Sequence, residues 1–188
     1  MKKHIEIESK YSGADIDIYA FKALAMKLKP VSFLYVESTD VYYTKSETEF
    51  LRYRMAADGD KDRRAELTFK KKHSDNNNIV RTEVNLRVDP NEPDTVVAFC
   101  EGIGYTRNFS IYKICQIYYF DDADIVYYTV IDEADKIAHY IEIEVLEDLD
   151  VTPEQGWEII RKYEELLSPL GINAQKRMKL SLFERYRK

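Results

Sequence analysis

Three stretches of this chain carry pairs of like charges two positions apart. The pairs are Glu6 and Glu8, Arg52 and Arg54, and Glu142 and Glu144. Successive side chains of a strand point to opposite faces, so the two members of each pair share one face. Like charges side by side repel, and a purely structural face gains nothing from them. A site for a divalent cation and a polyanion does gain, because such cations bind several carboxylate oxygens and phosphates bind Arg and Lys.

Further charged or polar residues share these faces with the pairs. They are Lys10, Lys70, Lys72, Arg81, Glu83, Asn85, Arg87, Lys113 and Asp132. The opposite faces of the same stretches carry mainly Ile, Leu, Val, Phe and Tyr. One interpretation is an antiparallel sheet whose polar face is simply solvated. The recurrence of like-charge pairs favours the other interpretation, a face that binds a metal ion and phosphates together.

The spacing of apolar residues predicts about eight strands and two or three helices. Strands are expected over residues 4–10, 31–44, 50–55, 64–72, 79–88, 109–120, 124–132 and 140–145. Helices are expected over residues 14–28, 94–103 and 152–167, and the basic tail 175–188 is expected to be partly helical. The strands follow one another in hairpin order, which favours a closed or nearly closed antiparallel barrel. Because the chain has no linker rich in Gly, Pro or Ser, we expect one α+β domain over residues 1–188.

Composition narrows the classes of protein that fit. The net charge of -6 argues against a general nucleic-acid-binding surface, which needs an excess of Lys and Arg. No apolar run is long enough to span a membrane, and the first residues lack the pattern of a secretory signal. Cys100 and Cys115 have no His or Cys neighbour at metal-ligand spacing, so they are expected to be reduced thiols. These features predict a cytoplasmic protein.

The ordered set of charged stretches resembles the motifs of the CYTH family, the triphosphate tunnel metalloenzymes. Glu6-x-Glu8-x-Lys10 resembles the N-terminal signature of that family. The stretches that resemble its later motifs, in order, are Asp40-Val-Tyr-Tyr43, Leu51-Arg-Tyr-Arg54, Leu67-Thr-Phe-Lys70, Arg81-Thr-Glu83, Lys113, Asp132 and Glu142-Ile-Glu144. Residues 179–184 lie where the family ends in a basic and aromatic motif. Each motif alone is common, but the ordered set covers nearly the whole chain.

The resemblance implies a fold and a set of site residues. The fold is an eight-stranded antiparallel β-barrel flanked by several helices, with a charged tunnel open at both ends. The residues implied to hold Mg or Mn are Glu6, Glu8, Asp132, Glu142 and Glu144. Those implied to hold phosphates are Lys10, Arg52, Arg54, Lys70, Arg81, Lys113 and Lys179. Glu83, assisting at a second metal or at a water, and Lys10 are the residues assigned to catalysis.

The sequence departs from the family pattern at three positions. Asn85 stands where the family often has a second Glu, and Cys115 stands where an Arg is usual. Leu182 stands where the C-terminal motif often has Tyr. Loss of the Arg removes a phosphate contact unless Arg87 or Arg107 substitutes for it. We therefore expect altered or weak activity as one outcome.

The residue types themselves suggest the chemistry of hydrolysis. Carboxylates hold divalent ions against the phosphate chain while Arg and Lys neutralise its charge, and a water attacks the terminal phosphorus. Such catalysis works by electrostatic positioning and needs no Ser, Cys or His nucleophile. The first hypothesis is therefore metal-dependent hydrolysis of a small-molecule triphosphate, whether inorganic, nucleoside or thiamine triphosphate.

Two functional alternatives stay open on the sequence. One is a class IV-type adenylate cyclase, which converts ATP to cyclic AMP and pyrophosphate. The other is a module that binds a triphosphate or nucleotide without turning it over, which the changes at Asn85 and Cys115 motivate. The sequence also leaves open whether the chain forms a homodimer.

Overall fold

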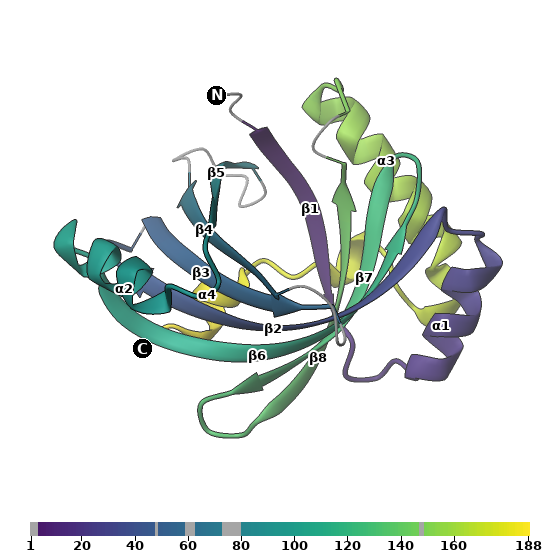
Figure 1. Ribbon diagram of the computed structural model, residues 1–188. Helices are drawn as coiled ribbons and strands as arrows, with labels where there is room; N and C mark the ends of the chain where they lie inside the picture. Colours follow the sequence, from purple (N-terminus) through teal and green to yellow (C-terminus); the bar gives the residue numbers. More distant parts are fainter. Residues whose placement is uncertain (1–3, 48, 59–62, 73–79, 147–148) are drawn as a thin grey trace.

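The computed structural model describes residues 4–47, 49–58, 63–72, 80–146 and 149–188 (Figure 1). The side chains of residues 4–6, 72 and 80–82 lie outside this description. Among the described residues, no helix is long and apolar enough to cross a membrane.

Eight strands and four helices make up the described chain. The strands are β1 (His4–Ser12), β2 (Ser32–Thr44), β3 (Glu49–Ala57), β4 (Arg63–Lys72), β5 (Val80–Val88), β6 (Thr106–Tyr119), β7 (Ala123–Asp132) and β8 (Ile137–Val145). The helices are α1 (Ile18–Lys27), α2 (Pro93–Gly102), α3 (Pro153–Leu166) and α4 (Leu182–Tyr186), with 3-10 turns at Ser168–Leu170 and Ala174–Lys176. The predicted α+β class, with eight antiparallel strands and flanking helices, is confirmed.

The strands pair in the order β1-β5-β4-β3-β2-β6-β7-β8, and every pair is antiparallel. The two ends of the sheet are joined only by β1, because one part of this strand pairs with β5 and the other part pairs with β8. Residues 4–7 pair with β5, and residues 8–12 pair with β8. Figure 1 shows β1 standing between these two parts of a strongly curved sheet. The wall is therefore continuous across β1 only because this one strand pairs with two different neighbours.

The outer, convex side of the sheet is apolar and is covered by helices. Ile7, Ile141 and Ile143 of β1 and β8 belong to one buried cluster with residues of α1 and α3. A second cluster joins β3 and β4 to α2, and Figure 1 shows α2 far from α1 and α3. Full burial of one such Ile contributes about 1.5–3 kcal/mol. Because these strands bury their apolar residues outward, their alternate positions are free to place charged residues inward.

One end of the concave side is filled by the C-terminal segment. Phe183 of α4 stacks on Phe50 with ring centroids 4.3 Å apart, and Phe109 stacks on Tyr42 at 4.4 Å. Leu182 and Phe183 are buried in the same cluster as these strand residues. The aromatic ends of β2, β3 and β6 therefore receive α4.

A partly buried ion pair fixes the segment that leads to α4. Glu164 of α3 accepts two hydrogen bonds of 2.6 Å from Arg177 and one of 2.6 Å from the Tyr11 hydroxyl. The next residue, Met178, donates its backbone N–H to the Lys10 carbonyl at 2.7 Å. The tail is thus fixed to both α3 and β1 before it turns into α4.

Substitution of Gly156 by Ala tests the contact between α3 and β1. A Cβ at Gly156 would lie 2.4 Å from Ile7 Cδ1, and Ile7 is 4% exposed. The buried Ile7 side chain must move, so we expect Gly156→Ala to lower the free energy of unfolding by about 1–3 kcal/mol. The control is Gly102→Ala at the end of α2, where a Cβ meets nothing within 4 Å. Urea unfolding of both variants measures the effect, and an equal response in the two would contradict this packing.

Candidate functional site

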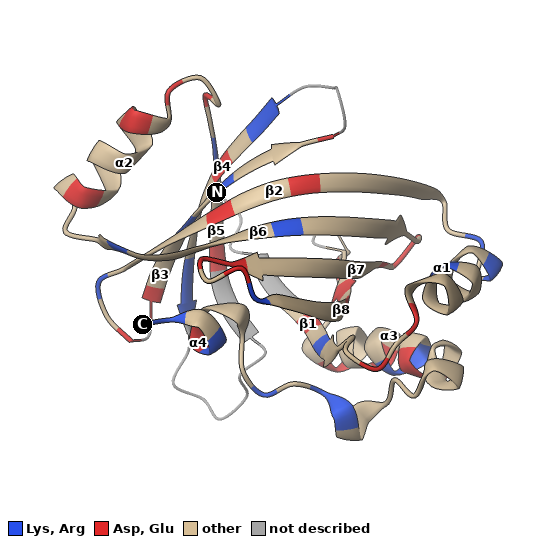
Figure 2. Cartoon of the chain, turned by 90° about the horizontal axis from the view of Figure 1, so that it is seen from below, with Lys and Arg blue, Asp and Glu red and all other residues tan. Residues whose placement is uncertain are grey.

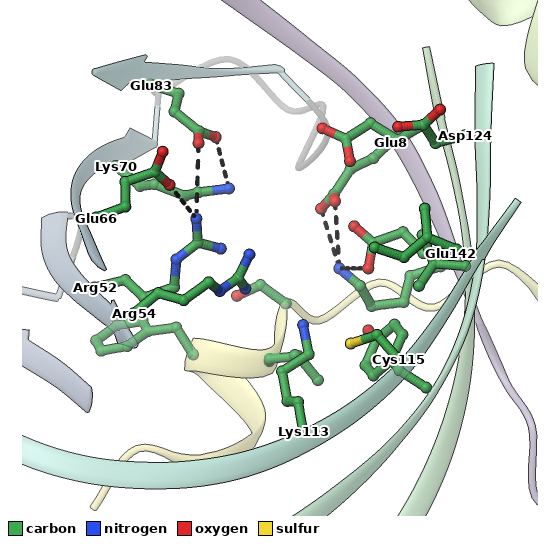
Figure 3. A pocket seen from close by; sticks show the side chains of 18 of the residues that line it. Glu8, Arg52, Arg54, Glu66, Lys70, Glu83, Lys113, Cys115, Asp124 and Glu142 are labelled. Atoms are coloured by element: carbon green, nitrogen blue, oxygen red, sulfur yellow. Dashed lines mark hydrogen bonds and ion pairs between the residues drawn. The ribbon is translucent and has the colours of Figure 1, made fainter. Parts of the chain in front are cut away.

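A cavity of about 340 Å³ lies on the concave side of the sheet. Its lining includes side chains from all eight strands and from the start of α4. Figure 2 shows that charged residues lie along the strands as well as on the helices. Figure 3 shows the arrangement from close by: cations and their partners on one side, and a group of carboxylates with one Lys on the other.

The basic wall comes from neighbouring positions on β3, β4 and β5. Lys70 Nζ lies 2.7 Å from Glu83 Oε2, and the register places these two residues directly opposite each other. Arg52 donates to Thr68 Oγ1 at 3.1 Å and lies 3.9 Å from Glu83 Oε1. Burial alone would raise the pKa of Glu83, but the charges of Lys70 and Arg52 lower it below its usual value. Glu83 is therefore an ionised acceptor.

Arg54 is held by a carboxylate behind it. Asp40 of β2 is fully buried and accepts hydrogen bonds of 2.7 and 2.8 Å from Arg54 Nε and Nη2. Burial raises the pKa of Asp40, but the charge and hydrogen bonds of Arg54 outweigh it and hold that pKa well below its usual range. The paired geometry fixes the plane of the guanidinium.

The acidic wall comes from β1, β7 and β8. Glu8, Asp124, Glu142 and Glu144 line it. Lys10 Nζ lies 3.2 Å from Glu8 Oε1 and 3.2 Å from Glu142 Oε2, so an ammonium bridges two carboxylates. Burial and the charge of Glu8 still raise the pKa of Glu142. This wall therefore favours additional positive charge.

Lys113 and Cys115 of β6 form the floor between the two walls. Lys113 is 7% exposed, and its Nζ lies 4.4 Å from the centre of the Tyr128 ring. Within the described part of the chain, Lys113 makes no hydrogen bond or ion pair, and burial lowers its pKa. Burial also raises the pKa of the Cys115 thiol, which therefore stays protonated at neutral pH.

The charges of the lining indicate what the cavity can bind. Five Lys and Arg side chains and six Asp and Glu side chains line it. A polyphosphate entering alone would find no excess of positive charge, whereas one accompanied by divalent cations would find partners for both. Among the described residues, no group of three or more His, Cys, Asp or Glu is already arranged as a metal site. The donors are nevertheless all carboxylates, which fit Mg or Mn, and Lys10 supplies a cation between two of them.

Most of the predicted site residues meet in this cavity. The ones that line it are Glu8, Lys10, Arg52, Arg54, Lys70, Glu83, Lys113, Glu142 and Glu144. Glu6 and Arg81 are paired with each other in the β1–β5 ladder, but their side chains lie outside the described residues. Lys179 is exposed and does not line the cavity.

Asp132 is not brought to the cavity. Its Oδ1 accepts the backbone N–H groups of Ala134 at 2.8 Å and Lys136 at 3.0 Å, so it shapes the turn between β7 and β8. Asp124, on the same face of β7 but at its other end, lines the acidic wall instead. Alternation predicts the face of a strand correctly but not the depth at which a residue lies.

Three site residues were missed by sequence reasoning. Glu66 and Asp124 line the cavity, and Asp40 supports Arg54. Glu66 shares the face of Lys70 and Asp124 shares that of Asp132, so alternation within the predicted strands could have found both. Of the two suggested substitutes for the absent Arg, Arg107 pairs with Glu133 away from the cavity, and Arg87 lines an adjoining chamber.

Comparisons with known proteins match this chain by structure but not by sequence. No family model matches it, and no curated protein matches it. A "conserved hypothetical protein" from Pyrococcus furiosus is 23% identical with a TM-score of 0.72, over 95% of this chain and 98% of that chain. A "putative adenylate cyclase" from Vibrio parahaemolyticus is 16% identical with a TM-score of 0.73, over 97% and 98%. A chain of the Schizosaccharomyces pombe Mediator head module is 11% identical with a TM-score of 0.66, over 88% and 95%.

These likenesses establish the fold. Each of these neighbours is less than 25% identical to this chain, so they confirm the predicted architecture and no more. The chain from the Mediator head module has the same fold. Function must therefore be argued from the side chains of the cavity.

Asp40→Asn tests the support of Arg54. The substitution leaves the Arg54 charge without its buried partner, so we expect the free energy of unfolding at neutral pH to fall by about 2–4 kcal/mol. Because the folded-state pKa of Asp40 is depressed, its stabilising contribution is present above the unfolded-state pKa of about 3.9 and is lost as the pH falls below it. The difference between wild type and variant should therefore narrow in acid.

Urea unfolding across this pH range measures the difference. Asp15→Asn is the control, because Asp15 is exposed. A loss of stability that is independent of pH would contradict the ionic role of Asp40.

Proposed function

We propose that this protein is a metal-dependent triphosphatase that hydrolyses a triphosphate compound inside the charged cavity. The observation that carries the proposal is the opposition of two walls across one cavity: a wall of carboxylates with Lys10 on β1, β7 and β8, and a wall on β3, β4 and β5 where Arg52, Arg54 and Lys70 are paired with carboxylates. A metal–polyphosphate complex is complementary to such a pair of walls, because its cation and its phosphate oxygens need opposite partners.

The acidic wall would hold Mg or Mn. The candidate ligands with described side chains are Glu8, Glu142, Glu144 and Asp124, and Glu6 precedes Glu8 by two positions on the same face of β1. A bound divalent ion neutralises phosphate charge and lowers the pKa of a coordinated water. Lys10, which bridges Glu8 and Glu142 in the structure, becomes available to a phosphate oxygen when those carboxylates have another cation.

The basic wall binds and orients the phosphate chain. Arg54 presents a guanidinium fixed from behind by Asp40, and Arg52 and Lys70 stand beside it. Lys113 lies on the floor of the cavity. It has no ion pair with a carboxylate among the described residues, so none must be broken before it binds a phosphate. Fixed cations of this kind stabilise charge as it develops on the transferred phosphoryl group.

Glu83 is placed to orient the attacking water. Its lowered pKa keeps it ionised, so it accepts a hydrogen bond more readily than it stores a proton. Its contacts with Lys70 and Arg52 keep it next to the phosphate-binding groups. We assign it the role of a positioned acceptor beside the terminal phosphate.

With α4 filling one end of the tunnel, substrate enters and product leaves at the opposite end.

Two other functions have specific observations in their favour. The Vibrio neighbour is described as a "putative adenylate cyclase", and this likeness motivates the cyclase hypothesis. A cyclase would release pyrophosphate and cyclic AMP. Asn85 and Cys115 both line the cavity, at positions where the resembling family often has a Glu and an Arg. These changes favour the alternative that the protein binds its ligand without converting it. The products formed from a triphosphate separate these functions from hydrolysis.

The first test is turnover of inorganic, thiamine and adenosine triphosphates with Mg or Mn. We expect phosphate release that stops on chelation and falls about a hundredfold or more in Glu8→Gln and Glu142→Gln, because metal stabilisation of the transition state is worth several kcal/mol. Glu154→Gln, an exposed carboxylate on α3, is the control. Formation of cyclic AMP and pyrophosphate would establish the cyclase instead, and tight binding without products would establish the binding module.

The second test follows the proton on Lys113. Burial lowers the pKa of Lys113, and a polyanion beside it favours the charged form and raises that pKa again. Binding of Mg-triphosphate at alkaline pH should therefore take up protons, and affinity should fall as the pH rises through the lowered pKa.

Calorimetry in two buffers of different ionisation enthalpy measures the proton uptake. Lys113→Met should abolish it and weaken binding, whereas Lys71→Met, at an exposed Lys on β4, should preserve both. Unchanged proton uptake in Lys113→Met would contradict the assignment of Lys113 to the phosphate site.

A further inference from the structure

A second chamber of about 630 Å³ adjoins the charged cavity. The two share Arg54, Glu66, Ile117 and Tyr119, so the chamber is the direct continuation of the site. It lies where β2 begins and where β3 and β6 end, whereas α4 packs at the other ends of these strands. A group attached to a phosphate chain in the cavity therefore has room to extend into this chamber.

One side of the chamber is apolar. Leu34 and Val36 of β2 line it together with Ile117 and Tyr119 of β6, and Leu34 pairs with Ile117 in the ladder. Neither the inorganic phosphate chain nor a metal ion has use for such a surface. A flat organic ring does, because it stacks on aromatic side chains and packs on aliphatic ones.

The other side of the chamber is basic. Arg63 and Arg64 of β4 and Arg87 of β5 line it, and all three are exposed. Within the described part of the chain, none of the three has a hydrogen bond or an ion pair, whereas Arg52, Arg54 and Lys70 in the inner cavity each have a carboxylate partner. The charge of Arg64 opposes the rise that burial causes in the pKa of Tyr119, which places the basic side close to the aromatic one.

Among the described residues, no carboxylate makes an ion pair with these arginines, although the charges of Asp124 and Asp58 reach Tyr119 of the same chamber. Glu66 lies opposite Arg87 in the ladder, but its Oε1 lies 3.7 Å from Arg52 in the inner cavity. Three like charges lining one chamber repel one another, and folding gains nothing from that arrangement. An anionic group beyond the triphosphate would relieve the repulsion, since Arg binds phosphate and carboxylate oxygens through paired hydrogen bonds.

We propose that this chamber selects an organic triphosphate whose ring-bearing part carries a negative charge of its own. A nucleoside 5′-triphosphate with a further phosphate on its ribose has this chemistry. The ring lies on the Ile117 and Tyr119 side, and the added phosphate lies among Arg63, Arg64 and Arg87. The inference rests on the proposed function, because it takes the triphosphate to occupy the inner cavity. It selects against thiamine triphosphate, whose cationic ring the arginines repel, and against inorganic triphosphate, which leaves the chamber empty.

The test measures the affinity of four probes for wild type and for the double variant Arg64→Ala, Arg87→Ala. The probes, each with Mg, are inorganic triphosphate, thiamine triphosphate, ATP, and adenosine 3′-phosphate 5′-triphosphate. We expect wild type to bind the last probe about tenfold more tightly than ATP, a difference of about 1.4 kcal/mol. The double variant should lose this difference and keep its affinity for inorganic triphosphate. Arg161→Ala, at an exposed Arg on α3, is the control and should keep the difference.

The following results would overturn the inference. If wild type bound ATP as tightly as adenosine 3′-phosphate 5′-triphosphate, the chamber would not select for the added phosphate. If wild type bound thiamine triphosphate more tightly than adenosine 3′-phosphate 5′-triphosphate, it would not select for negative charge. If the double variant lost affinity for inorganic triphosphate as much as for adenosine 3′-phosphate 5′-triphosphate, the arginines would only attract anions in general. If none of the four probes binds, the proposed function fails together with the inference; if inorganic triphosphate binds and the 3′-phosphate gives no gain, the inference alone fails.

The phosphate on the ribose could belong to a free nucleotide or to the next nucleotide of an RNA chain. A longer 5′-triphosphorylated oligoribonucleotide distinguishes these two sources. The net charge of -6 favours a free nucleotide over an RNA chain, whose further phosphates would meet an acidic protein. The oligonucleotide should therefore bind no more tightly than adenosine 3′-phosphate 5′-triphosphate. Binding that strengthens with each added nucleotide would overturn the assignment to a small molecule.

Discussion

The cost of burying charge governs this structure. An ion that leaves water loses several kcal/mol of solvation unless another charge and good hydrogen bonds replace it. The cavity meets this requirement pairwise, with Lys10 between Glu8 and Glu142, Lys70 on Glu83, and Asp40 behind Arg54. A wall with an excess of carboxylates thus faces a wall of paired Arg and Lys, and a ligand with both signs of charge can replace the pairing partners.

Such an interior is possible because the sheet buries its apolar residues on the outside. Ile7, Ile141 and Ile143 lie under α1 and α3, so the outer side of the sheet contributes hydrophobic stabilisation in addition to the cluster around α4. The outer layer also determines where α4 lies. Glu164 of α3 binds Arg177, and this contact positions α4 against the aromatic residues of β2, β3 and β6 at one end of the concave side. Outer packing and inner chemistry are linked through the C-terminal tail.

Alternation in the sequence was sufficient to predict the strands, the faces and most of the cavity. Each strand has only two faces, so a charge at the right parity is placed correctly whenever the element is correct. Depth along the strand depends on register and on where the wall curves, which explains why Asp124 and not Asp132 reaches the acidic wall. The position of α4 depends on long-range contacts such as Phe183 with Phe50, which no local pattern contains.

A crystal structure with Mn and a non-hydrolysable triphosphate tests the central claim most directly. The anomalous signal of Mn should lie on the acidic wall beside Glu8, Glu142 and Glu144, with the phosphates reaching Arg52, Arg54 and Lys70. Lys10 should have moved from the two carboxylates to a phosphate oxygen. A triphosphate bound outside the cavity, or Mn absent from that wall while Lys10 still bridges Glu8 and Glu142, would contradict the account.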